Sequence, residues 1–342
     1  MKVLKYLTIG LFLLASLAFT YSSYRQNIIE VTKEDSVYKV LQILGEKRVS
    51  HAIDSVTPEL IKTGEELIKK GYSKNPKGKK SKRISNHFVC TSCHNTEKED
   101  PNLKDALNPE ARLQYCKENN IPFLQGTTLW GIVNRESWYN DDYIKKYGDL
   151  VIKAQSSLSE STQLCAQECS QGRPLEPWEL KAILAYYWSI QIKISDLDIS
   201  KAVFDKLNTA MTEEEKKELI TNLKSMYSQK SSAHFISAKT EQSVIKKLPL
   251  GNSENGKLIY DISCKSCHKP NGVSLMTLNS SKITKRKFTN NLGTNSHFDL
   301  YYISREGTYP LQGHKAYMPL YPKERMSSQQ IKDLISFLTL EN

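Results

Sequence analysis

The pentapeptide Cys-x-x-Cys-His occurs twice in this chain, at residues 90–94 and 264–268. This spacing is the attachment signature of c-type haem, because two thiols must reach the two vinyl groups of one porphyrin while the adjacent histidine ligates the iron. The sequence therefore predicts two covalently bound haem c groups. Thioether bonds and proximal iron ligands are predicted at six residues: Cys90, Cys93, His94, Cys264, Cys267 and His268.

Two other uses of paired cysteines fit this chain less well. A zinc ribbon separates its Cys-x-x-Cys pairs by about 15–20 residues, whereas these pairs lie in different halves of the chain. A thioredoxin-like redox pair needs a βαβ pattern around it, and no such pattern is visible. Both alternatives are therefore disfavoured.

The N-terminus has the features of an export segment. Lys2 and Lys5 precede an apolar run at residues 6–19, and Ser16 and Ala18 are small residues at the positions that a signal peptidase reads. Extended to Tyr24, the run is also long enough for a membrane anchor. We therefore expect residues 1–24 to be a signal peptide or an anchor. The protein body is expected in the periplasm, either free or anchored to the inner membrane, with no other contact to the membrane.

The chain is basic, with 48 lysines and arginines against 37 acidic residues in 342 residues. The densest basic run lies at residues 69–83. Such a run is either a solvated linker or a surface that attracts an anionic substrate or an acidic redox partner. Nucleic-acid binding is not expected, because the sequence contains no recognised binding module.

Helix signals predict a mainly α-helical protein. Thr57 followed by Pro58 is a helix start, and a second strong helix is expected from Pro177 to about Ile192. Thr212 with three following glutamates marks a further start, whereas residues 95–148 look irregular. The predicted order is the N-terminal segment, an extension at 25–56, a haem domain at 57–195, a helical connector at 196–245 and a haem domain at 246–342.

The second haem domain follows the order of an ordinary monohaem cytochrome c. A short helix precedes Cys264, and Ser327 with Gln330 forms a capping box for a last helix. Met318 lies between the haem motif and that helix, followed by a proline, and a thioether suits haem iron. Met318 is therefore predicted to be the distal ligand of the second haem, with His297 and His314 as alternatives.

The first haem lacks the usual distal ligands, because residues 95–195 contain neither histidine nor methionine. This stretch does contain Cys116, Cys165 and Cys169. Three cysteines allow one disulfide and one single thiolate, and a thiolate is a competent haem ligand. A lysine ligand or an open iron site are the alternatives.

Residues 164–175 and 179–186, together with residues 85–89, resemble the first domain of dihaem thiosulfate dehydrogenases and, more distantly, the SoxA subunit of the sulfur-oxidation system. The resemblance implies that Cys165, seven positions before Gly172, is the distal iron ligand and catalytic residue of the first haem. It leaves Cys116 and Cys169 to form a disulfide. The chain departs from the family at Glu168 and Cys169, where the family usually has arginine and serine.

The sequence thus predicts two cytochrome c-like haem domains that transfer electrons outside the cytoplasm. In one interpretation a small sulfur oxyanion such as thiosulfate is oxidised at the first haem, and electrons leave through the second haem. Arg135 and Arg173 are the arginines that remain to bind such an anion. In the alternative, the protein is a pure electron carrier. In both, the partner is a redox protein or a component of a respiratory chain.

Overall fold

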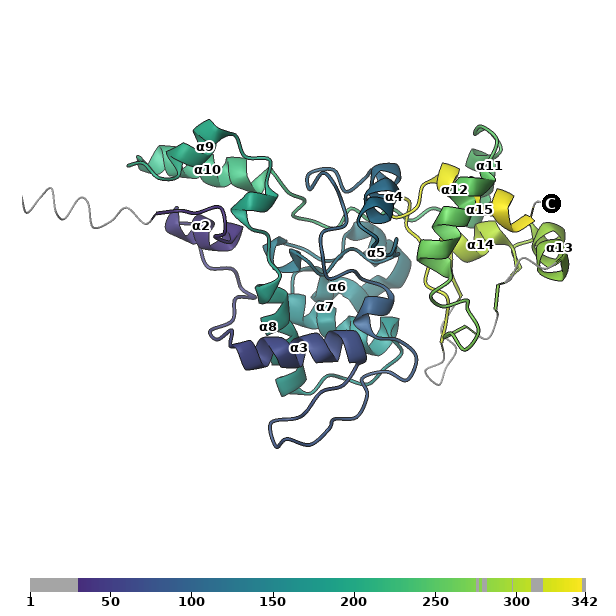
Figure 1. The fold of residues 1–342 in the computed structure, drawn as a ribbon, viewed down its shortest axis with the longest axis horizontal. Helices are drawn as coiled ribbons and strands as arrows, with labels where there is room; N and C mark the ends of the chain where they lie inside the picture. Colours follow the sequence, from purple (N-terminus) through teal and green to yellow (C-terminus); the bar gives the residue numbers. More distant parts are fainter. Residues whose placement is uncertain (1–29, 275–276, 279–281, 297, 309–315, 340–342) are drawn as a thin grey trace, which may run out of the picture. The chain divides into compact units, whose positions relative to one another are not determined.

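The computed structural model describes residues 30–274, 277–278, 282–296, 298–308 and 316–339 (Figure 1). The regular structure of these residues is helical, and they contain isolated bridges, Ser36 with Lys193 and Lys74 with Lys80, but no strand. The mainly α-helical prediction is therefore confirmed. The expected export segment at 1–24 lies outside the described residues. Of the helices that the structure describes, none has the length and hydropathy to cross a membrane.

The described residues fall into two compact units. The first unit consists of Met1–Arg48, of which the structure describes residues 30–48, and Ile192–Met226. Backbone and side-chain bonds join its two segments: Val37 N donates to Ile192 O at 2.9 Å, and Val31 N donates to Asn208 Oδ1 at 2.7 Å. Its helices are α2 (Val37–Ile43), η5 (Ile194–Asp196), α9 (Lys201–Lys206) and α10 (Glu213–Lys224).

The predicted helix start at Thr212 is confirmed in this unit. Thr212 Oγ1 accepts from Glu215 N at 3.2 Å, and Glu215 Oε2 accepts from Thr212 N at 2.8 Å. Each side chain thus satisfies a backbone donor that the first turn of α10 leaves without a helical partner.

The second unit consists of Val49–Gln191 and Tyr227–Asn342 and contains both haem motifs. Its helices up to the end of the first segment are α3 (Pro58–Lys70), η1 (Cys90–Ser92), α4 (Pro109–Glu118), η2 (Ile132–Asn134), α5 (Asp141–Tyr147), η3 (Gly148–Val151), α6 (Ile152–Gln155), α7 (Leu158–Leu164), the π-helical turn η4 (Cys165–Cys169) and α8 (Pro177–Ser189). The second segment contains α11 (Ala238–Ile245), α12 (Ser253–Ile259), the π-helical turn η6 (Tyr260–Cys264), α13 (Lys282–Asn291), α14 (Leu300–Arg305) and α15 (Ser328–Thr339).

Two closely packed helix pairs organise the second unit, α3 with α8 and α12 with α15. Each pair contains a glycine where the helices meet. A Cβ on Gly64 of α3 would lie 2.0 Å from Ala182 O, and a Cβ on Gly256 of α12 would lie 2.0 Å from Asp333 O. Only glycine allows the backbones to approach this closely. The first haem motif follows α3 in the chain, and the second follows α12.

The predicted starts of α3, α8 and α15 are confirmed. Thr57 Oγ1 accepts from Leu60 N at 3.2 Å before α3. Before α15, Gln330 Oε1 accepts from Ser327 N at 2.9 Å in the expected capping box. Helix α8 begins at Pro177 as expected but ends at Ser189, shortly before the chain passes into the first unit at Ile192.

The expectation of an irregular segment at residues 95–148 was wrong, since it contains α4 and α5. Asn108 caps α4, with Oδ1 accepting from Ala111 N at 3.0 Å, and Asn140 caps α5 in the same way. The asparagine and proline signals were present in the sequence. Helix α4 also supplies core: Leu113 and Cys116 pack in one apolar cluster with residues of the second motif's helices, such as Ile259.

Candidate haem sites

The first haem motif is a tight turn that presents its histidine to a neighbouring loop. His94 N donates to Cys90 O at 3.0 Å, and His94 Nδ1 lies 2.6 Å from Thr127 O. A carbonyl oxygen only accepts, so Nδ1 carries the proton and Nε2 keeps its lone pair. Burial lowers the pKa of His94, which holds the ring neutral. The donor set of this motif, two thiols and a neutral imidazole with Nε2 available, fits haem c.

The loop at residues 122–129 wraps the His94 ring. Gly126 N donates to Cys93 O at 2.9 Å. A Cβ on Gly126 would lie 2.5 Å from His94 Cε1 and 2.6 Å from His94 Nδ1. Glycine is therefore needed here by close approach to the ring.

The structure brings four thiols together at the first motif. Cys165 and Cys169 lie in the π-helical turn η4, in which Ser170 N donates to Cys165 O at 2.8 Å. A hydrogen bond between the two thiols raises the pKa of Cys165 and lowers that of Cys169, and Cys165 also interacts electrostatically with Cys90 and Cys93.

All four of these cysteines are only half-buried in the structure, yet burial is strong enough to raise the pKa of Cys90 to about 11 and that of Cys93 to about 12.

The predicted disulfide between Cys116 and Cys169 is wrong. Cys116 is 1% exposed in the apolar cluster of α4, with Sγ 4.0 Å from Glu99 O. Cys169 instead contacts Cys165 and Tyr139. The number of cysteines indicated that a pair was available, but α4 had not been recognised as a helix that buries Cys116 elsewhere.

The two candidate anion-binding arginines have different environments. Arg173 forms a bidentate ion pair with Glu179, with both N–O distances 2.7 Å, so its charge is neutralised. The Arg135 guanidinium, within the described part of the chain, has no hydrogen bond or ion pair in the structure. Burial lowers its pKa, and it interacts electrostatically with His94.

The second haem motif turns like the first. His268 N donates to Cys264 O at 3.1 Å, which matches the 3.0 Å bond of the first motif, and burial raises the pKa of Cys264 to about 12. The motif begins at Cys264, the last residue of the π-helical turn η6, where Lys265 N donates to Tyr260 O at 3.0 Å. Two thiols and a histidine in this turn provide the same donor set for haem c.

Met318, the predicted distal ligand of the second haem, has its backbone fixed by Thr308. Met318 N donates to Thr308 Oγ1 at 2.7 Å, and Thr308 N donates to Met318 O at 2.9 Å. The neighbouring Tyr317 ring packs edge-on against Phe88, just before the first motif, with centroids 5.9 Å apart. The alternative ligands His297 and His314 lie outside the described residues.

One short segment, residues 122–128, is bonded to the first motif and to the residues directly before the second motif. Phe123 N donates to Ile262 O at 3.0 Å, and Ser263 Oγ donates to Phe123 O at 2.7 Å, directly before Cys264. Three residues further on, Gly126 bonds to Cys93, and Cys93 also interacts electrostatically with Cys267. No spacing in the sequence indicated this connection.

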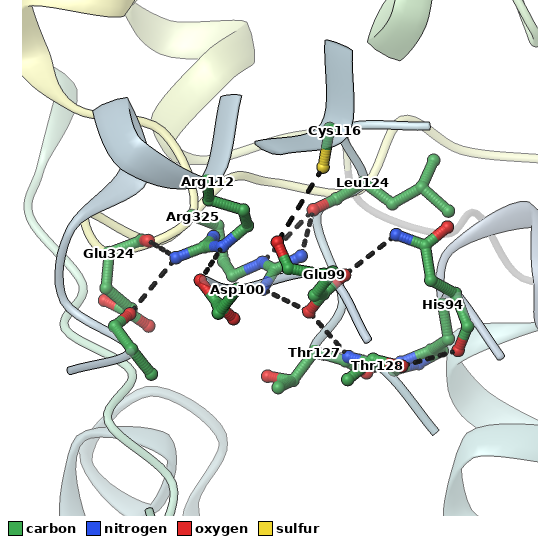
Figure 2. A network of polar contacts seen from close by, with 12 residues as sticks. His94, Glu99, Asp100, Arg112, Cys116, Leu124, Thr127, Thr128, Glu324 and Arg325 are labelled. Carbon is green, nitrogen blue, oxygen red and sulfur yellow. Dashed lines mark hydrogen bonds and ion pairs between the residues drawn. The ribbon is translucent and has the colours of Figure 1, made fainter. Parts of the chain in front are cut away.

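A buried charge network lies beside this segment (Figure 2). Arg325 pairs with Glu99 at 2.7 Å, and Arg112 pairs with Asp100 at 2.8 Å. Burial alone would raise the pKa of Glu99, but Arg325 and Arg112 lower it to about 2. Sequence reasoning missed all four residues, because two pairs from distant parts of the chain leave no local pattern.

The basic run at residues 69–83 forms an ordered turn. Lys74 and Lys80 form an antiparallel bridge, and Asn75 Oδ1 accepts from Lys77 N and Lys79 N at 3.0 Å each. The lysine side chains of this turn are exposed. The run is therefore solvated, as one interpretation expected, and has a defined backbone conformation.

Comparison with known proteins identifies one part of the chain. Residues 253–340 match the family model of cytochrome c. This segment is therefore a cytochrome c domain, a class that binds haem c covalently and exchanges electrons with a redox partner. It includes the second haem motif, α12, Met318 and α15. No curated protein matches the chain, and no solved structure does.

Proposed function

We propose that this protein is a dihaem c-type cytochrome that transfers electrons outside the cytoplasm to a redox partner protein or a respiratory chain component. The observation that carries the proposal is the segment at residues 122–128, which is hydrogen-bonded to Cys93 of the first motif and to Ile262 and Ser263, directly before the second motif. The first haem motif, held this close to the cytochrome c domain, is arranged for electron exchange with a haem in that domain. The export segment expected at 1–24 supports a location in the periplasm or on the inner membrane.

The parallel between the two motifs supports a haem at the first motif as well. Each motif follows a helix that contains a glycine where it packs against a later helix. The glycine is Gly64 before the first motif and Gly256 before the second. Each motif closes with a bond from the histidine N–H to the first cysteine carbonyl. Haem c, when bound, supplies a one-electron couple at each motif. The chain's own residues attach, orient and bury that group.

The proposal is tested by counting haems. The denatured protein, produced with a haem c maturation system, should have the mass of the polypeptide plus two haems. The double variant Cys90→Ser/Cys93→Ser should carry one haem, and so should Cys264→Ser/Cys267→Ser. A parent protein with a single haem on Cys264 and Cys267 would contradict the dihaem proposal and leave only the cytochrome c domain.

A second candidate function is the oxidation of a sulfur compound such as thiosulfate at the first haem. Two observations favour it: Cys165 interacts electrostatically with Cys90 and Cys93, and Arg135 is a partly buried cation without a bonded anion in the described residues. A thiolate at that position is both an iron ligand and a nucleophile toward sulfur, and Arg135 would hold an oxyanion. The alternative anion for Arg135 is a haem carboxylate.

Thiosulfate-dependent reduction of the oxidised protein separates these functions. If the protein is an oxidoreductase, thiosulfate reduces the parent, and both Cys165→Ala and Arg135→Gln lose that reduction at least tenfold. The exposed Lys82→Gln, which removes the same charge, is the matched control and should retain it. A parent protein that thiosulfate does not reduce, although dithionite does, is a pure electron carrier.

A further inference from the structure

The carboxylate of Glu99 lies where the cytochrome c domain meets the loop that holds His94. We propose that Glu99, locked by Arg325 of the cytochrome c domain, is a positioning residue for His94, so that the seating of the second haem domain sets the proximal ligand of the first haem. This inference rests on the proposed first haem.

The first step is the bond that orients the histidine. His94 Nδ1 donates to Thr127 O at 2.6 Å. A hydrogen bond from the distal nitrogen of a ligating imidazole fixes the ring orientation and raises the electron donation of the ligating nitrogen. The position of Thr127 O therefore controls both properties of His94.

The second step is the support of that carbonyl. Glu99 Oε1 accepts from Thr128 N at 2.8 Å, and this N–H belongs to the same planar peptide group as Thr127 O. Glu99 Oε2 accepts from Asn95 Nδ2 at 2.8 Å, and the same amide nitrogen donates to Pro122 O at 2.9 Å. Glu99 thus ties Thr128, at one end of the loop, to Asn95, the residue after His94, and Asn95 ties Pro122 at the other end.

The third step brings in the other haem domain. Arg325 NH1 donates to Glu99 Oε1 at 2.7 Å, and its Nε and NH2 donate to Leu124 O at 3.1 and 2.7 Å. The Arg325 and Glu99 side chains are 4% and 0% exposed. A carboxylate buried this deeply stays ionised only with a paired cation. Arg325 lies in the turn before α15 and belongs to the segment that matches cytochrome c.

Asp100 provides a matched comparison within the same network. It is also a carboxylate paired with a buried arginine, Arg112, at 2.8 Å. Among the described residues, its side chain bonds to Arg112 and not to residues 122–128, so it shares the network but not the support of Thr127 O.

The test measures the reduction potential and electron paramagnetic resonance signal of the first haem in Glu99→Gln and Arg325→Gln. If the pair acts through His94, both variants weaken the bond to Thr127 O, reduce electron donation and raise the potential of the first haem. Direct charge effects predict opposite signs, because one variant removes a negative charge and the other a positive charge. A rise in both, with a shifted first-haem signal and an unchanged second haem, supports the inference.

The controls separate positioning from folding. Asp100→Asn should lower the unfolding midpoint without moving the first-haem signal or potential, and Arg325→Lys, which keeps the cation, should give a smaller shift of the same sign as Arg325→Gln. Opposite signs in the two neutral variants, or no shift in folded protein, would overturn the inference. If Glu99→Gln does not fold, Arg325→Lys is compared with Asp100→Asn. A raised first-haem potential in Arg325→Lys but not in Asp100→Asn supports the inference, and no rise in folded Arg325→Lys overturns it. A parent protein without a haem at Cys90 and Cys93 would instead refute the proposed function.

Discussion

Replacing Gly126 by alanine tests whether the loop at residues 122–129 is built around the His94 ring. The new Cβ would lie 2.5 Å from His94 Cε1 and 2.6 Å from His94 Nδ1, whereas carbon atoms in contact are about 3.5–4.0 Å apart. The ring or the loop must therefore move by about 1 Å. A movement of that size is enough to break the 2.6 Å bond from His94 Nδ1 to Thr127 O.

The magnitude follows from these two effects. Overpacking of a tight site costs about 1–3 kcal/mol, and the loss of one hydrogen bond costs about 0.5–1.5 kcal/mol. We expect Gly126→Ala to lower the free energy of unfolding by about 2–4 kcal/mol. It should also change the resonance signal of the first haem while leaving that of the second haem unaltered.

Denaturant unfolding followed by circular dichroism gives the stability, and electron paramagnetic resonance of the oxidised protein gives the haem signal. The control is Gly78→Ala, where the added Cβ meets nothing within 4 Å and only the left-handed φ of 76° opposes it. That strain costs about 1–2 kcal/mol far from the His94 ring. If Gly126→Ala has parental stability and an unchanged first-haem signal, the geometry assigned to His94 is wrong.

Three further changes have defined outcomes. Met318→Ala should abolish the sulfur-to-iron charge-transfer band near the red end of the visible spectrum and lower the potential of the second haem; an unchanged band assigns the ligand to another residue. Cys165→Ala should remove the thiolate-type low-spin signal of the first haem while Cys169→Ala retains it, and the reverse pattern would assign Cys169. The pKa of Glu99 is lowered from its usual 4.5 to about 2, so its stabilisation is complete above its unfolded pKa and is lost as the pH falls through its folded pKa. Unfolding free energy should therefore fall between about pH 5 and 2, and Glu99→Gln should flatten that fall; an equally steep fall in the variant would refute this.

The sequence alone determined the chemistry of attachment. Two thiols and a histidine at the spacing of Cys264, Cys267 and His268, in the segment that matches cytochrome c, are constrained by the size of a porphyrin, so a local pattern is sufficient to recognise them. Helix starts are also local, because an N-cap side chain bonds to a backbone N–H only two or three residues away. The starts at Thr57 and Thr212 were predicted for this reason.

The tertiary structure decided what lies around those motifs. The partners of Glu99 and Phe123, namely Arg325 and Ser263, are more than 130 residues away in the chain. Contacts at such separation depend on which helices pack together, and no spacing in the sequence encodes them. Cys116 was misassigned for the same reason: the number of cysteines says that a pair can form, but only the burial of α4 decides which thiols can meet.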